Sequence, residues 1–315
     1  MASNSGHVCA HCLAPPRPVS TIVGAFGAGE SSMLSDHALR LKSIEYRKKI
    51  LTVIRSAQAG HTGGSLSCVD ILNVLYNAAM NVRPENFGSP DRDRYVQSKG
   101  HSVEALYVVL ADKGFFSEEE LKTLSKYKSH FVGHPTRKVP GIEHNTGALG
   151  HGLSFAVGQA LAGKKDGRSY KVYVLLGDGE LAEGSNWEAS ISAVNFGLDN
   201  LVALVDRNGF QITGATERVY PLEPLEDKFR AFGYAVRTAD GNNVAELRSV
   251  LREIPFEKER PSLILARTTK GKGISFMENV AAWHHRVPND DEHALALREL
   301  EDAEIQLRGE PQVER

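Results

Sequence analysis

The sequence has few cysteines, little net charge and no long apolar run. Its 315 residues include three cysteines, and 37 basic residues nearly balance 39 acidic ones. This balance argues against a nucleic-acid-binding or membrane-surface protein. No apolar stretch approaches the roughly 20 residues that cross a bilayer. Two cysteines share one short segment, so we expect no disulfide scaffold. No signal-peptide pattern opens the chain, and we expect a cytoplasmic protein.

The first 35 residues differ in composition from the rest. They are rich in Ser, Gly and Ala and are broken by prolines, which predicts a flexible tail over 1–35. Cys9 and Cys12 form a Cys-x-x-Cys pair, but no second ligand pair lies nearby, so a structural metal site is not favoured. The glycine run at 24–29 departs from the dinucleotide pattern, and we interpret it as a linker. Residues 36–315 are predicted to form one domain.

Helix signals begin at the boundary of the tail. Ser35 and Asp36 are good N-cap residues, and the apolar spacing from Leu39 predicts a helix that Gly60 ends. A loop is predicted over 60–64. Further helices are predicted over 68–80, 102–113, 152–162, 185–196, 244–252 and 291–307, and a capping box at 117–120 opens another.

The second half of the chain contains short, continuous apolar runs. Such runs predict buried parallel strands over 172–176 and 201–205, and further strands over 234–238 and 262–266. Helices alternate with these strands. The pattern predicts an α/β fold with a parallel sheet that helices cover on both faces.

Polar residues follow two of these strands. Gly177-Asp178-Gly179-Glu180 comes directly after one strand, and Asn208 follows the next. Ligands of open parallel sheets bind beyond the carboxyl ends of the strands, where neighbouring strands would bring Asp178 and Asn208 together. Carboxylate, amide and carbonyl oxygens suit Mg²⁺ or Ca²⁺. Gly-Asp-Gly alone is equally an ordinary turn, but with Asn208 it resembles the thiamine-diphosphate motif.

Glycine-flanked histidines occur at His61, His101 and His134, followed by the segment 145–152 and by His284 after a tryptophan. A single histidine is usually a surface residue or a satisfied core residue. Together with the motif that begins at Asp178, however, these segments resemble the transketolase family in matching order, over roughly residues 36–290. The resemblance implies the thiamine-diphosphate-binding fold, in its diphosphate-binding domain.

The family's functional residues map onto matching positions of this sequence. The resemblance implies that the metal is bound by Asp178, Asn208 and the carbonyl of Phe210. It implies that the cofactor is bound by His101, Gly147, Leu149, Gly177, Asp178, Gly179, Glu180, Asn208 and His284. It gives catalytic roles to His61, His134 and His284, which would face the sugar, and to Glu183, which would lie at the dimer interface and link two active sites.

The implied chemistry is the transfer of a two-carbon ketol unit from a ketose, or ketose phosphate, to an aldose. Thiamine diphosphate supplies an electron sink for this reaction. Imidazole groups suit proton transfer to and from sugar hydroxyls near neutral pH. Mg²⁺ offsets the charge of the diphosphate.

The family places the aminopyrimidine ring in a second α/β domain, which carries an activating glutamate and phosphate-binding arginines. After residue 290 the chain has no room for such a domain. We therefore expect a partner subunit of the C-terminal transketolase type, in an α2β2 heterotetramer. Arg137 and Arg286 lie near the motifs, and we interpret both as solvated.

The sequence departs from the family pattern at two positions. His151 stands where glutamine is common, and His285 stands where glycine is common, so either position can affect substrate choice. The resemblance implies that the segment 269–273 is a loop near the cofactor, and its lysines are interpreted as solvated. Two other functions stay open: the α-subunit of a 2-oxo-acid dehydrogenase, which lacks the Gly-His series, and a non-catalytic scaffold subunit, against which the presence of Asp178 and His61 argues.

Overall fold

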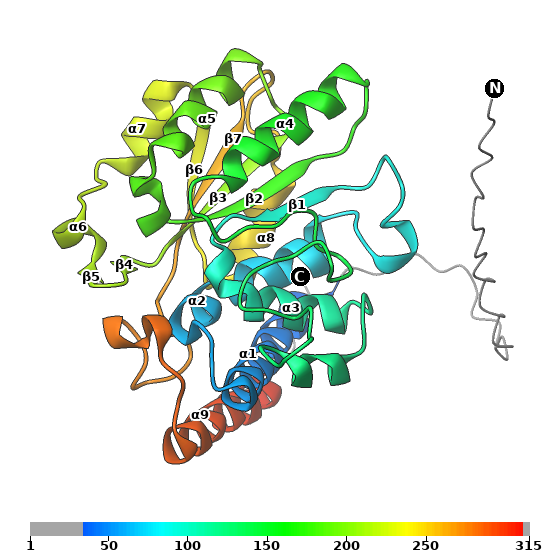
Figure 1. Cartoon of the computed structure of the whole chain (residues 1–315). Coiled ribbons are helices and arrows are strands. Elements are labelled where there is room, and N and C mark those ends of the chain that lie inside the picture. Colours follow the sequence, from blue (N-terminus) through cyan, green and yellow to red (C-terminus); the bar gives the residue numbers. More distant parts are fainter. Residues whose placement is uncertain (1–33, 311–315) are drawn as a thin grey trace, which may run out of the picture. The chain divides into compact units, whose positions relative to one another are not determined.

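The computed structural model describes residues 34–310 (Figure 1). The predictions for the tail, the Cys9–Cys12 pair and the glycine run fall largely outside this range. Within it, five parallel strands form one sheet in the order β1-β2-β3-β7-β6. They are β1 (Arg94–Gln97), β2 (Val172–Gly177), β3 (Leu201–Arg207), β6 (Ala235–Asp240) and β7 (Ser262–Arg267).

Helices cover both faces of this sheet (Figure 1). One layer contains α1 (Asp36–Ala57), α2 (Thr62–Val74), α3 (Val103–Asp112) and α8 (Val244–Arg252), with α9 (Asp290–Gly309) against α1; the other contains α4 (Gly152–Lys165), α5 (Gly184–Asn195) and α7 (Leu225–Phe232). Successive side chains of the central strands enter opposite cores: Leu175 packs in the first and Val174 in the second. The predicted α/β fold is confirmed.

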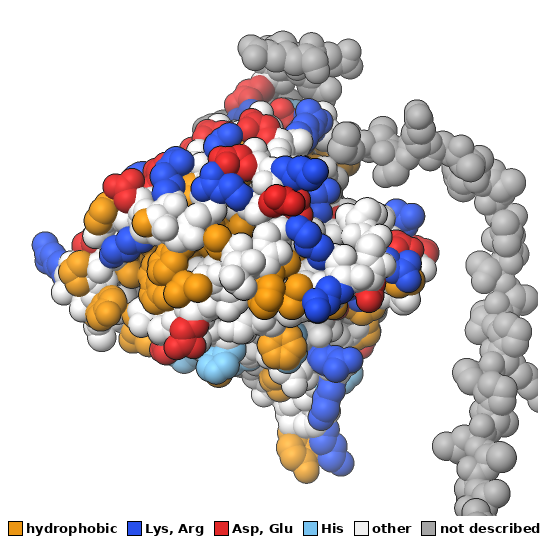
Figure 2. Space-filling model, turned by 90° about the horizontal axis from the view of Figure 1, so that it is seen from above, with side chains coloured by type: hydrophobic (Ala, Val, Ile, Leu, Met, Phe, Trp, Pro, Cys, Tyr) orange, Lys and Arg blue, Asp and Glu red, His pale blue; other side chains and the backbone are white. Residues whose placement is uncertain are grey.

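The outer face of the second layer is partly apolar. Figure 2, seen from above Figure 1, shows hydrophobic side chains gathered among charged ones on the side where α4, α5 and α7 lie. Phe155 on α4 and Ile191 on α5 are exposed there, as is Phe196 just after α5. Exposed apolar side chains that gather on one face are typical of an interaction surface.

Local sequence signals account for several element boundaries. The Ser35 hydroxyl accepts the N–H of Ala38, so α1 begins where predicted. The predicted capping box joins Ser117 and Glu120, although it opens a 3₁₀ helix, Glu118–Thr123, rather than an α-helix. All four predicted strands are present within two residues of their predicted ends, and α8 has the predicted bounds.

The predicted loop at 60–64 is wrong. Its last three residues begin α2, six residues earlier than expected, and the helix continues into a π-helical turn, Leu75–Ala79. Every residue of α2 is buried, so packing overrides the low helix propensity of its two glycines. Gly60 also does not end α1: the helix ends at Ala57, and Gln58 adopts the left-handed conformation.

The sequence analysis missed several short elements. They are β1, α7, the hairpin of β4 (Phe210–Gln211) and β5 (Gly214–Ala215), α6 (Thr216–Val219), and the 3₁₀ turns Pro84–Asn86, Gly100–Ser102, Gly179–Ala182 and Ala281–His285. Most are too short to show a hydrophobic period. In the part of the chain that the structure describes, no helix combines the length and apolar character needed to cross a membrane.

Candidate active site

The site begins at the carboxyl ends of β2 and β3. The strands pair Gly177 with Asp206, so Asp178 and Asn208 lie at the same edge of the sheet, as predicted. Asp178 joins the two loops: Oδ2 accepts the N–H of Gly209 at 2.7 Å, and Oδ1 accepts the N–H of Gly179 at 2.7 Å. The loops that carry the predicted metal ligands are therefore held together by one carboxylate.

The oxygen atoms at this edge are of the types that bind divalent cations in proteins. Asp178 is 1% exposed, and burial raises the pKa of its carboxyl, with Asp206 adding to the effect. Asn208 accepts the N–H of Phe210 at 3.0 Å, which orders the third predicted ligand. Residues 34–310 contain no group of three or more His, Cys, Asp or Glu that could hold a metal. A cation at this edge would therefore need further oxygen atoms from a bound small molecule. Proteins commonly bind Mg²⁺ in this way, with one or two carboxylates and the oxygens of a phosphate group.

A pocket of about 430 Å³ opens directly above these loops. Among the predicted site residues, all but Glu183 line it: His61, His101, His134, Gly147, Leu149, Gly177, Asp178, Gly179, Glu180, Asn208, Phe210 and His284. Residues from both halves of the chain thus meet in one cavity. Lys99, Lys270 and Gln211 also line it, and the sequence analysis missed them.

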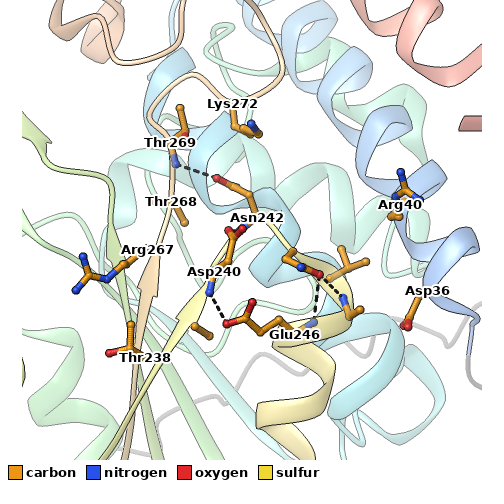
Figure 3. Close-up of a pocket in the computed structure, with 14 residues that line it drawn as sticks. Asp36, Arg40, Thr238, Asp240, Asn242, Glu246, Arg267, Thr268, Thr269 and Lys272 are labelled. Carbon is orange, nitrogen blue, oxygen red and sulfur yellow. Dashed lines mark hydrogen bonds between the residues drawn. The ribbon is translucent and has the colours of Figure 1, made fainter. Parts of the chain in front are cut away.

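A wider hollow of about 1000 Å³ lies at the carboxyl ends of β6 and β7 (Figure 3). It contains none of the predicted site residues. Its polar groups bind one another: the amide of Asp240 donates to Glu246, and the amide of Thr269 donates to Asn242 (Figure 3). We therefore take the smaller pocket as the candidate active site.

Histidine rings form one wall of the pocket. The ring centroid of His61 lies 5.2 Å from that of His101, 6.2 Å from that of His134 and 5.5 Å from that of His284. Burial, aided by neighbouring positive charges, lowers the pKa of His61 to about 4 and that of His284 to about 3. Both rings are therefore neutral at pH 7, and each can donate one hydrogen bond and accept another. The buried Nδ1 of His61 has no partner among the described residues.

Gly147 makes room for His134. Its φ is +135°, and a Cβ there would lie 2.6 Å from Cδ2 of His134. A side chain at 147 would therefore be strained and would displace the ring. This close approach explains why a glycine stands at this position of the segment 145–152.

Two buried lysines bring positive charge to the pocket. Lys99 forms an ion pair with Asp206 and donates to the carbonyl of Gly64. Lys270 is 1% exposed, and its Nζ lies 3.0 Å from Nδ1 of His284. Burial, with the charge of Lys99, lowers the pKa of Lys270 to about 8. The prediction that the lysines of 269–273 are solvated is wrong for Lys270. Lys99 could have been recognised as a pocket residue from the sequence, because it directly precedes the Gly-His pair at 100–101.

The two glutamates of the Gly-Asp-Gly segment lie differently. Glu180 is buried and accepts the N–H groups of Gly150 at 2.9 Å and Gly177 at 3.0 Å, so its carboxylate joins two pocket loops. Glu183 is exposed, packs on Gly150 and does not line the pocket. Its position leaves it available to another chain.

The positions that depart from the family pattern lie at the edge of the site. His285 is exposed, and its ring centroid lies 4.5 Å from that of His61, so it extends the histidine wall at its outer edge. His151 is also exposed, with Nδ1 3.1 Å from the carbonyl of Leu149. Arg286 pairs with Glu292 at the surface, in agreement with its predicted exposure.

A family profile described as "Transketolase, thiamine diphosphate binding domain" matches residues 42–301. The chain belongs to the transketolase family. The family match agrees with the parallel sheet and with the pocket at its carboxyl edge, and it places the thiamine-diphosphate-binding domain on the described part of the chain.

Relatives within the family are of two lengths. The chain is 48% identical to an apulose-4-phosphate transketolase subunit of Phocaeicola vulgatus, over 84% of this chain and 94% of the relative. It is 44% identical to a 6-deoxy-6-sulfo-D-fructose transketolase subunit of Clostridium sp., over 81% and 93%. The transketolase structure of Campylobacter jejuni superposes with a TM-score of 0.78 at 29% identity, over 85% of this chain but 45% of that one.

Proposed function

We propose that this chain is the diphosphate-binding subunit of a thiamine-diphosphate-dependent transketolase. It would transfer a two-carbon ketol unit from a ketose or ketose phosphate to an aldose or aldose phosphate, together with a C-terminal-type partner subunit. The observation that carries the proposal is the single pocket in which the histidines, both buried lysines and the Asp178–Asn208 edge meet. The family match favours this function over a 2-oxo-acid dehydrogenase subunit.

The floor of the pocket would hold the cofactor. Asp178, Asn208 and the carbonyl of Phe210 would bind Mg²⁺ or Ca²⁺, and His101, Gly179 and His284 would contact the diphosphate. Lys99 and Lys270 would add positive charge where the diphosphate lies, because both are buried and line the pocket. The other predicted cofactor contacts are Gly147, Leu149, Gly177 and Glu180. Bound there, thiamine diphosphate supplies the electron sink for carbon–carbon cleavage.

The histidine wall would face the sugar. His61, His134 and His284 are uncharged near neutral pH, so each can accept a proton from a sugar hydroxyl or hold a hydroxyl by a hydrogen bond. The free Nδ1 of His61 supports this role, since a buried ring nitrogen without a partner favours a polar ligand. His285 lies against His61 and would narrow the sugar end of the pocket.

The partner requirement rests on two observations. The relatives whose names describe one subunit of a transketolase are about as long as the matched part of this chain, whereas the chain spans under half of the Campylobacter jejuni transketolase. The exposed apolar side chains of α4 and α5, and the exposed Glu183 beside Gly150, suit contact with other chains. We propose an α2β2 heterotetramer in which Glu183 lies at the interface between the two diphosphate-binding subunits. We keep the cytoplasmic location as a prediction.

The test is reconstitution. The chain is produced alone and together with a candidate partner that carries the pyrimidine-binding domain, and the complex is purified and assayed against ketoses and aldoses with and without anionic end groups. We expect co-purification, and ketol transfer only by the complex in the presence of thiamine diphosphate and Mg²⁺. Strong turnover by a verified single-chain preparation would refute the split enzyme. A complex that binds the cofactor but transfers no ketol unit would favour the scaffold function.

A further inference from the structure

A fully buried carboxylate lies behind the histidine wall, and the proposed function gives it no role. Glu104 is 0% exposed and lies in the first turn of α3. Its Oε1 accepts the backbone N–H of His61 at 3.2 Å, and its Oε2 accepts the hydroxyl proton of Ser65 at 2.8 Å. His61 and Ser65 belong to the start of α2. One side chain of α3 therefore fastens the first turn of the neighbouring helix.

Helix α2 has no cap of its own. Its N-cap residue, His61, makes no side-chain capping hydrogen bond, and its first turn contains no acidic residue. The first N–H groups of a helix lack intrahelical partners, and negative charge is favoured beside them. Glu104 supplies the acceptor that the N-terminus of α2 lacks. It also lies in the first turn of α3, so the carboxylate serves two helix N-termini.

The chain makes room for this contact at Gly60. The residue has φ +152°, and a Cβ there would lie 2.7 Å from Oε1 of Glu104. Any larger residue at position 60 would push the carboxylate away from the N–H of His61. The glycine that precedes His61 thus permits the approach on which the contact depends.

Burial disfavours the charged form of this acid. Burial raises the pKa of Glu104 from 4.5 to about 7, while the hydrogen bonds from Ser65 and His61 act in the opposite direction. A raised carboxyl pKa means that this group favours folding most below pH 4.5, and that the benefit is lost as pH rises through about 7. The other titratable neighbour is Tyr107 of the same helix, whose hydroxyl donates to the carbonyl of Val132. Burial thus favours the neutral carboxyl, which still offers an oxygen acceptor to the N–H of His61.

We propose that Glu104 is a positioning residue: it caps α2 and so fixes the backbone from which the His61 imidazole enters the pocket. The inference rests on the proposed function insofar as His61 faces the sugar. The contact to the backbone N–H of His61 is present whatever the substrate is.

The experiment compares three variants of the full chain. Glu104→Gln keeps an oxygen for the His61 N–H and gives Ser65 an amide partner. Glu104→Met has a similar size but no strong acceptor. Asp112→Asn is the matched control. Asp112 is the last residue of α3, at the opposite end of the helix from Glu104, and its carboxylate accepts the hydroxyl proton of Tyr46. The histidine side chains are observed by nitrogen-15 NMR, with His61→Gln to assign the His61 signals. The complex with the partner gives KM and kcat for a ketose donor.

We expect Glu104→Met to shift the His61 signals and to raise the pKa of His61 from about 4 toward its usual value, as the ring leaves its buried position. KM should rise about tenfold or more, with cofactor affinity within about twofold of the native value. Glu104→Gln and Asp112→Asn should leave the His61 signals in place.

Unchanged His61 signals in Glu104→Met, or the same shift in Asp112→Asn, would overturn the inference. If Glu104→Met does not fold, Ser65→Ala replaces it: loss of one carboxylate contact should give a smaller shift in the same direction, and no shift would count against the role. The NMR result does not depend on turnover. A complex without transketolase activity would therefore refute the proposed function and leave the Glu104 contact to be decided by the spectra.

Discussion

Asp178 binds four groups at once, the hydroxyl of Thr216 among them, and this determines how its substitution acts. Besides the amides of Gly179 and Gly209, it forms an ion pair with Arg207 at 3.0 Å. Asp178→Asn keeps one oxygen for an amide but removes the charge that a cation needs. We expect the fold to persist, while thiamine diphosphate affinity falls at least about tenfold and no longer depends on Mg²⁺. Calorimetry with Mg²⁺ and with EDTA measures this, with Asp240→Asn, in the other hollow, as control. Unchanged Mg²⁺ dependence would remove the metal assignment.

Lys270 gives the pocket a charge that depends on pH. With a pKa of about 8 it is charged at pH 7 and loses its proton above pH 8, whereas Lys99 keeps its charge because the Asp206 carboxylate outweighs the effect of burial. An anionic ligand should therefore bind more weakly as pH rises from 7 to 9, by up to about tenfold. Lys270→Met should bind weakly at both pH values. Lys272→Met, whose lysine is partly exposed and paired with Glu278, should behave like the native chain. Calorimetry at pH 7 and pH 9 measures the affinity of each chain for the anionic ligand. A native affinity that did not change with pH would contradict the contribution of the Lys270 charge to binding.

Sequence patterns predict residues at strand ends better than residues in loops. Asp178 and Asn208 follow apolar runs, so their meeting could be foreseen from the rule for parallel sheets. Lys270 lies in a polar, glycine-rich segment with no period to indicate burial. Its environment comes from α2: a Cβ at Gly63 would lie 3.1 Å from Cγ of Lys270. Such a contact joins residues about two hundred positions apart, and no local signal encodes it.

The segment 145–152 gives a test at the scale of an element. Gly147→Ala combines a left-handed backbone with a clash against His134, whereas Gly167→Ala has φ +65° and no atom within 4 Å of the new Cβ. Both should lose about 1–3 kcal/mol of unfolding free energy from backbone strain. Only Gly147→Ala should also shift the NMR signals of His134 and reduce ketol transfer in the complex. Equal effects of the two substitutions on His134 would contradict a close approach of Gly147 to that ring.

A buried ion pair joins α1 to α2. Arg47 and Asp70 lie 2.6 Å apart, both almost fully buried, and Arg47 also donates to the carbonyl of Lys272. Arg47→Met leaves a buried carboxylate without its partner, so the unfolding free energy should fall by about 3–5 kcal/mol. Lys48→Met, which breaks the more exposed pair with Glu304, should lose about 0–1 kcal/mol. Urea denaturation compares them. A similar loss of unfolding free energy in both variants would mean that the buried pair stabilises the fold no more than the exposed one.

Element types were easier to predict than element starts. The central strands β2 and β3 each begin with five apolar residues that are buried in the sheet, so their pattern is unambiguous. The start of α2 could not be predicted, because its glycines disfavour a helix locally. The contacts that explain it come from distant residues: the packing of the first turn against Lys270 and His101, and the hydrogen bonds to Glu104. The edge strand β1 is four residues long and begins with an arginine, which hides it among loops.

At the scale of the molecule, the parallel sheet and the site at its carboxyl edge follow from the alternation of strands and helices, whereas the strand order and the partner do not. The pocket of this chain contains groups suited to a diphosphate and to a sugar: two lysines, the Asp178 edge and neutral histidines. The proposed function assigns the aminopyrimidine ring to the partner. The two rings of the cofactor would therefore be bound by different chains.

A thiazole diphosphate lacks the aminopyrimidine ring of thiamine diphosphate. The difference between the affinities of the two compounds therefore measures what that ring contributes to binding. The isolated chain should bind the thiazole diphosphate within about threefold of its affinity for thiamine diphosphate, because both share the diphosphate that Lys270 and Asp178 would face. In the complex with the partner, thiamine diphosphate should bind at least about a hundredfold more tightly than the thiazole, since the ring then gains its contacts. Calorimetry with both ligands on both preparations measures the difference. A strong preference for thiamine diphosphate by the isolated chain would mean that this chain holds the aminopyrimidine ring itself, and the division of the site between two chains would have to be abandoned.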